Sequence, residues 1–213
     1  YIPNSGFPEE SRILLGGAPA QGADLLQILS QSFPIIALVI IVLTFLVLMR
    51  TFRSIVLAVK AIILDLLSIG LTFAVLVLIF EFGVGIYQLQ QIEAWVLILL
   101  FAILFGLSMD YEIFIVSRIR EARDKGASNE EAIREGMQAT GTVVTVAALI
   151  FVSALTGLIS GHFAGLQQLG IGLAIGVLID ATIIRGLLLP SAMVLLGRWN
   201  WWMPGKEEPR LSN

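Results

Sequence analysis

The sequence contains no cysteine and only one histidine. Without cysteine the chain can form neither disulfide bonds nor thiolate metal sites, and one histidine cannot supply a histidine metal cluster. Charged residues make up only 14% of the chain and form no long run of one sign, so nucleic acid is not an expected partner. The sequence shows no catalytic set of a nucleophile, a base and a group that orients the base. It therefore predicts neither an enzyme nor a bound cofactor.

Apolar residues are what the sequence has in excess. They account for 57% of the 213 residues, and the mean hydropathy of +0.92 lies far above that of soluble domains. Five apolar runs are each long enough, at ~1.5 Å per residue, to cross a hydrocarbon core of ~30 Å. They cover about residues 33–49, 55–80, 94–116, 138–160 and 165–196. The sequence therefore predicts an all-α integral membrane protein with five transmembrane helices in contact with membrane lipids.

Composition divides the chain into three parts. Residues 1–33 carry prolines and glycines between short apolar stretches, which indicates an extracytoplasmic lead-in. Residues 34–197 form the predicted transmembrane domain, in which Pro34 suits the first turn of the first helix, and residues 198–213 form an interfacial tail. The chain starts with Tyr and shows no signal peptide before the first apolar run, so we expect it to be a piece of a longer protein.

The connection over residues 117–136 predicts two short cytoplasmic surface helices. Gly126 can end the first, and Ser128 with Glu131 forms a capping box that can open the second.

Small residues recur at a spacing of four further along the chain. Such rows let helices in a membrane pack closely. They comprise Gly157, Gly161 and Gly165, and then Gly172 and Gly176.

Basic residues gather in alternate connections, which indicates the orientation. All of these connections must lie on one side of the membrane, and the positive-inside rule makes that side the cytoplasm. The N-terminus is then extracytoplasmic and the C-terminus cytoplasmic. The residues concerned are Arg50 and Arg53, then Arg118, Arg120, Arg123, Lys125 and Arg134, and finally Arg198, Lys206 and Arg210.

An acidic residue and a phenol stand side by side in the third apolar run. A carboxylate in hydrocarbon costs between ~3 and ~15 kcal/mol. A carboxylate in a membrane helix is therefore expected to have an ion-pair or hydrogen-bond partner, to contact water or to serve a function. Asp110 is therefore the leading candidate for function, and the neutral hydroxyl of Tyr111 can donate a hydrogen bond as its partner. Glu112 lies about 200° away around the helix, and we expect it to meet an arginine or lipid headgroups.

Other ionisable residues also fall inside the predicted spans. Asp65 lies at a depth similar to that of Asp110, and two neighbouring carboxylates in low dielectric could exchange protons. Asp180 and Arg185 are five residues apart, about 140° around an α-helix, so each is expected to pair with another helix. Lys60 is near the cytoplasmic end, where its side chain can reach the surface. The alternative is an ion-pair network that only fixes helix register.

The motifs resemble those of the C-terminal half of the MMPL family, exporters of lipids and hydrophobic compounds in the resistance-nodulation-division superfamily. The resemblance runs from about Leu15 to Pro204. The segments that carry it are Phe52-Arg53-Ser54, Phe105 to Glu112 (FGLSMDYE), Ser117 to Glu121 (SRIRE), Asp180-Ala181-Thr182 with Arg185, and Gly197 to Trp202 (GRWNWW).

What the resemblance implies is a bacterial plasma-membrane transporter of two pseudo-repeated halves. This chain would supply five helices of one half, and the N-terminal half of the same transporter would be its partner. Protons would be the coupling ion, with Asp110 and Tyr111 as a proton-relay pair. Asp180 and Arg185 match further residues associated with function, whereas Asp65 stands where the family commonly has Asn.

The expected function is therefore part of a proton-driven exporter of lipids or hydrophobic small molecules. One alternative is a membrane-embedded sensor or binding module for sterol-like lipids that does not pump. A second is a structural subunit whose polar residues serve only packing.

Overall fold

The computed structural model describes residues 18–83 and 91–202, with side chains from residue 24 onward. Its long helices are α1 (Ala18–Phe52), α2 (Ile55–Phe80), α3 (Ala94–Asp124), α4 (Asn129–Ile159) and α5 (Ala164–Ile179). The fifth continues through the π-helix η1 (Asp180–Leu188) into α6 (Leu189–Leu196) and the short 3-10 helix η2 (Gly197–Trp201). Five of these helical stretches are long and apolar enough to cross a membrane, and the described residues contain no strand. The predicted all-α membrane fold is confirmed.

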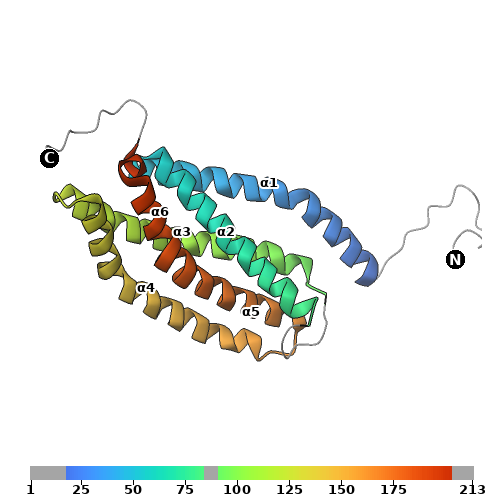
Figure 1. The fold of residues 1–213 in the computed structure, drawn as a ribbon. Coiled ribbons are helices and arrows are strands. Elements are labelled where there is room, and N and C mark those ends of the chain that lie inside the picture. The colour runs from blue at the N-terminus through green and yellow to red at the C-terminus, as the bar shows by residue number, and fades with distance from the viewer. Residues whose placement is uncertain (1–17, 84–90, 203–213) are drawn as a thin grey trace, which may run out of the picture.

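The five long helices form one bundle in which α3 is central. In Figure 1, α1 and α4 run along opposite edges, and α2, α3 and α5 lie between them. Helix α3 contacts each of the other four. Many large apolar side chains remain exposed on the outer helices, as on Ile35 and Leu38 of α1 and Ile150 of α4. An exposed apolar surface of this extent is typical of a protein that faces lipid.

Two helix boundaries differ from the sequence-based expectation. Helix α1 begins at Ala18, so Pro34 lies inside it and not in its first turn. The connection over 117–136 holds no separate surface helices within the described chain, because α3 and α4 extend through it to Asp124 and from Asn129. Side chains in this stretch are good helix formers, which favours continuation.

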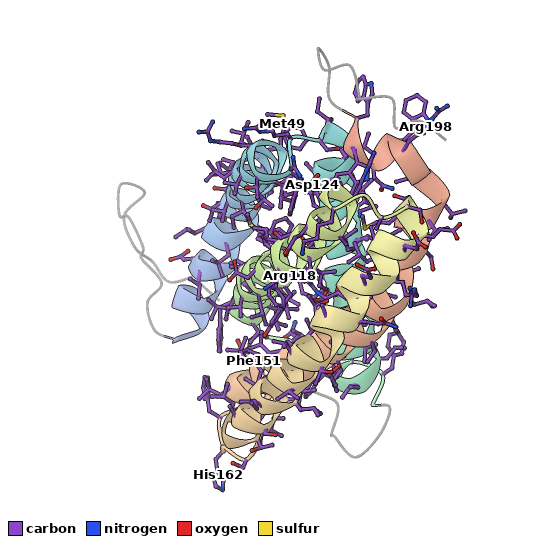
Figure 2. The ribbon with its side chains drawn as sticks, turned by 90° about the vertical axis from the view of Figure 1, so that its left-hand side faces the viewer. Met49, Arg118, Asp124, Phe151, His162 and Arg198 are labelled. Carbon is purple, nitrogen blue, oxygen red and sulfur yellow. The ribbon has the colours of Figure 1, made fainter. Side chains whose placement is uncertain are left out.

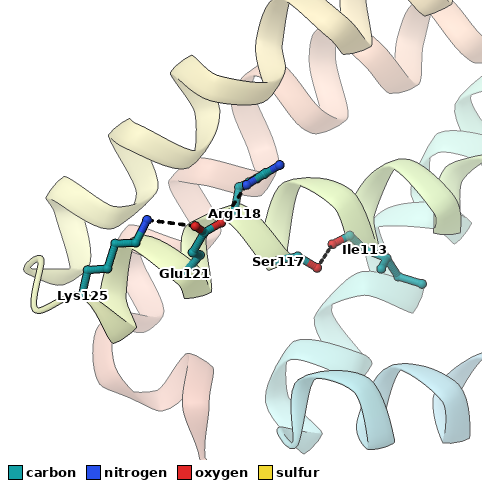
Figure 3. A network of polar contacts seen from close by, with 5 residues as sticks. All are labelled: Ile113, Ser117, Arg118, Glu121 and Lys125. Carbon is teal, nitrogen blue, oxygen red and sulfur yellow. Dashed lines mark hydrogen bonds and ion pairs between the residues drawn. The ribbon is translucent and has the colours of Figure 1, made fainter.

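Exposed ion pairs accompany the extension of α3. Glu121 accepts from Arg118 at 2.7 Å and from Lys125 at 2.8 Å, and Figure 3 shows the three side chains on one face of the helix. Each such pair stabilises a helix by only ~0.2–0.5 kcal/mol. The predicted capping box is confirmed, because the Ser128 hydroxyl accepts from Glu131 N–H while the Glu131 carboxylate accepts from Ser128 N–H.

Glycine allows close helix packing at some of the predicted positions. A Cβ atom at Gly172 or Gly176 would lie 2.7 or 2.6 Å from a methyl of Leu100 or Leu104. Gly165 is similarly tight against Trp95, whereas nothing lies within 4 Å of the same point at Gly157. The glycine spacing therefore predicts close packing correctly where α5 contacts α3. It does not do so at Gly157 on α4, which has no such close neighbour.

The end of the helical chain folds back on the start of α2. The Ser54 hydroxyl accepts from Leu57 N–H to cap α2 and donates to Asn200 O at 2.6 Å. Asn200 is buried, and its amide donates to Met193 O at 2.7 Å. Two segments far apart in the sequence are thus joined by buried polar contacts.

Candidate functional site

Three consecutive residues near the middle of α3 point in three directions. Asp110 is exposed, Tyr111 is half-buried and Glu112 is only 4% exposed. Each step along an α-helix turns by about 100°, which separates the three side chains. Asp110 belongs to an exposed stripe at intervals of three, four and seven residues, which we call the α3 open face. It consists of Leu99, Ala102, Ile103, Gly106, Asp110 and Ser117.

Asp180 and Arg185 form a direct ion pair within one helix, contrary to the sequence-based expectation. Arg185 Nε donates to Asp180 Oδ2 at 2.6 Å, and both side chains are buried. The cause is the π-helix η1, whose backbone hydrogen bonds join residues five apart, as in the bond from Leu189 N–H to Ile184 O. Residues 180 and 185 therefore stack on one face instead of lying 140° apart. Pro190 lies two residues after the end of η1, and its ring disfavours a regular α-helical turn before it.

Arg185 joins this ion pair to the α3 motif. Its Nη2 donates to the backbone carbonyl of Ser108, and its guanidinium carbon lies 5.4 Å from the centre of the Tyr111 ring. A cation at that distance over an aromatic face is attracted by the ring. Arg185 thus holds η1 against α3 through one ionic, one hydrogen-bonded and one ring contact.

A cavity of about 10 Å³ lies beside these contacts. That volume is about the minimum that holds one water molecule. Its polar lining comes from Ser108, Tyr111, Asp180 and Arg185. The hydroxyl-bearing and charged groups of α3 and η1 therefore converge on one small space.

Asp65 lies in the bundle interior and not beside Asp110. It is 1% exposed, and its charged neighbours are Glu112, Arg185 and Asp180. The expected approach of Asp65 to Asp110 is wrong, because Asp65 points inward from α2 while Asp110 points outward from α3.

Two further charged residues differ from the sequence-based expectation. Lys60 does not reach the surface: it is 7% exposed, and its Nζ is buried. Glu112 lies inside the bundle and not at the headgroups, but it does meet an arginine as expected, since Arg185 and Lys60 are among its charged neighbours. The sequence does contain a pattern that predicts the inward face of α2. The polar residues Asp65, Ser68 and Thr72 recur at helical spacing, and all three are buried.

The single histidine lies far from these groups. His162 is exposed in the turn between α4 and α5, and Figure 2 shows it at the opposite end of the bundle from Arg198.

Comparison with known proteins gives the family. The model of the MMPL family matches residues 4–211. This chain belongs to the MMPL family. It is 39% identical over 201 residues to the trehalose monomycolate exporter MmpL3 of Mycolicibacterium smegmatis, and 37% identical over 201 residues to MmpL3 of Mycobacterium tuberculosis. The heme uptake protein MmpL11 of M. tuberculosis is 33% identical over 198 residues.

These alignments cover nearly all of this chain but only a small part of its relatives. They include 92%, 92% and 91% of the chain, and 20%, 21% and 20% of the respective MMPL relatives. The chain is therefore a multi-pass membrane protein of the MMPL family that spans about a fifth of the length of those relatives.

Proposed function

We propose that this chain forms part of a proton-driven exporter of lipids or other hydrophobic compounds. The relatives with 39% and 37% identity are named as exporters of trehalose monomycolate, while a relative with 33% identity is named for heme uptake. Export of a lipid is the activity of the more similar relatives and is the one we assign.

The exposure of Asp110 on the α3 open face carries the proposal. Asp110 stands about halfway along a helix of 31 residues, far from either end. A carboxylate at that depth costs several kcal/mol if it faces lipid tails, so its face must meet protein or water. The rest of a longer MMPL transporter would supply that covering, with its N-terminal half against the α3 open face.

Protonation of Asp110 would couple the proton gradient to a conformational change. Moving one elementary charge through the membrane potential supplies ~2.3 kcal/mol per 100 mV. A proton that binds one arrangement of the bundle more tightly than another shifts the balance between them. Tyr111 follows Asp110 in α3 and its ring contacts Arg185, so a movement of this part of α3 on protonation of Asp110 would reach the ion pair on η1.

The proposed orientation places the C-terminal end of the bundle in the cytoplasm of a bacterial cell. Arg118, Arg120, Lys125 and Arg198 all lie toward the end where α3 meets α4 and where η2 ends the chain of helices. Figure 2 shows Arg198 and Asp124 near that end and His162 at the other. The positive-inside rule assigns the basic end to the cytoplasm.

Transport by the full-length protein in vesicles tests the relay. With fluorescent trehalose monomycolate as the probe and an imposed proton gradient, Asp110→Asn should lower the rate at least tenfold because Asn cannot bind and release a proton. Asp124→Asn is the matched control: it makes the same substitution at the exposed end of the same helix and should leave transport unchanged. Undiminished transport by Asp110→Asn would contradict the relay.

The same vesicles distinguish an exporter from a lipid-binding module. An exporter moves the probe only when the gradient is present, and protons move with it. Binding of the probe with no gradient-dependent movement in the unsubstituted protein would favour the sensor or binding module.

A further inference from the structure

The bundle interior holds a second group of ionisable side chains, apart from Asp110. All five members are at most 7% exposed, and they come from α2, α3 and η1. We call them the buried charge cluster: Lys60, Asp65, Glu112, Asp180 and Arg185.

The charges in this cluster do not balance. Three carboxylates stand against two cations, which leaves one negative charge in excess when all five are ionised. Asp180 and Arg185 neutralise one another through their contact of 2.6 Å. The excess therefore falls on Asp65 and Glu112, with Lys60 as the remaining cation.

Other charged groups do not compensate for the excess. The charged neighbours of Asp65 are Glu112 on α3 and Arg185 and Asp180 on η1. Glu112 has the same two η1 residues and Lys60 of α2 as its neighbours. Lys60 Nζ makes no hydrogen bond within the described part of the chain. An uncompensated charge in a low-dielectric interior carries a large free-energy cost.

The two carboxyl groups face one small cavity. Asp65 Oδ2 and Glu112 Oε1 are buried and have no hydrogen-bond partner among the described residues. Both side chains line a cavity that has no room for a water-sized sphere, so neither a water molecule nor a hydrated metal ion fits. A proton needs no such room. The rest of the lining consists of Leu64, Ile184, Arg185 and Leu189.

We propose that Asp65 and Glu112 hold one proton between them, as a second protonation site distinct from Asp110. The proton comes from the aqueous phase and forms one O–H bond on a carboxyl oxygen, with no electron transfer. The cluster then carries two positive and two negative charges. This inference goes beyond the proposed function and holds whether or not Asp110 relays protons.

Arg185 connects this site to the α3 motif. It lines both the cavity of Asp65 and Glu112 and the cavity of Tyr111 and Ser108. Release of the proton would place an additional negative charge beside the guanidinium that contacts the Tyr111 ring. The second site can therefore influence the position of Arg185 and Tyr111.

Infrared spectroscopy of the full-length protein in detergent tests the proposal. All variants are made in an Asp110→Asn background, so that the carboxyl of Asp110 does not contribute to the spectra. In that background at neutral pH, we expect the C=O band of a protonated carboxylic acid, shifted in D₂O, and its loss in both Asp65→Asn and Glu112→Gln. Either substitution balances the cluster, so the remaining carboxylate ionises. A band unchanged in both variants overturns the proposal.

Two further variants provide a control and an independent measurement. Glu130→Gln, at an exposed surface carboxyl, should leave the band intact. Lys60→Met removes a buried cation, so the cluster should take up a second proton and the band should grow about twofold. An unchanged band in Lys60→Met overturns the charge count even if Asp65→Asn fails to fold.

Discussion

Arg185 shows how one side chain can organise a membrane bundle. It donates to the Asp180 carboxylate and to the Ser108 carbonyl, and it covers the Tyr111 ring. The planar, forked guanidinium can make these contacts at once, whereas a lysine ammonium is a compact point charge that cannot reproduce them. At 3% exposure, neither Arg185 nor its partner can turn to water when the other is lost.

Removing either member of the buried ion pair should destabilise the protein strongly. Arg185→Met leaves Asp180 without its cation, and a broken buried pair costs about 3–5 kcal/mol. Thermal unfolding of the full-length protein in detergent measures the effect. The double variant Asp180→Leu with Arg185→Met should lose less than the sum of the two single variants, because it leaves no unpaired charge. Additive losses would show that the pair does not act as a unit.

At the scale of helices, the contact between α3 and α4 depends on a glycine. A Cβ atom at Gly136 would lie 2.4 Å from a side-chain atom of Ile119 and 2.8 Å from its backbone nitrogen. Backbone cannot move aside as a flexible side chain can, so the two helices would have to separate. Gly136 is buried, and the two helices meet closely there.

Gly136→Ala should therefore lower stability, and Gly141→Ala on the same helix should not. Overpacking of this kind typically costs about 1–3 kcal/mol. Nothing lies within 4 Å of the Cβ position at Gly141, where alanine should stabilise the helix by roughly 0.5–1 kcal/mol. Melting temperatures of the two variants in detergent give the comparison. Equal melting temperatures for the two variants would mean that α4 moves away from α3 without loss of stability.

At the scale of the whole molecule, the arrangement of the bundle makes the orientation testable. The turn that contains His162 and the connection between α3 and α4 lie at opposite ends of the bundle (Figures 1 and 2). The chain itself contains no cysteine, so an introduced thiol in this region is readily identified.

Labelling with a membrane-impermeant maleimide should distinguish the two ends. In intact cells, His162→Cys should react, while Glu130→Cys should react only after the membrane is permeabilised. Both positions are exposed, so a difference in labelling reports the side of the membrane and not burial. The reverse pattern would invert the proposed orientation.

Much of the architecture followed from one-dimensional features of the chain. Long apolar runs predicted the five spans, and Ser128 with Glu131 predicted a helix start, although the helix that begins there is the long α4 and not a separate surface helix. Helical phase separated Asp110 from Glu112 correctly, but it could not say which of the two faces the bundle. The assumption of regular α-helical turns failed at Asp180 and Arg185, where a π-helix adds about one residue per turn.

The sequence by itself determined that this protein lies in a membrane and which family it resembles, because hydropathy and short motifs are properties of the chain alone. Tertiary structure decided which ionisable residues meet. Burial of Lys60 and Glu112 and the exposure of Asp110 depend on how helices rotate against one another, whereas the pairing of Asp180 with Arg185 depends on the π-helical turn that contains both residues. Those rotations are set by packing at positions such as Gly136 and Gly176, where the neighbour lies far away in the sequence.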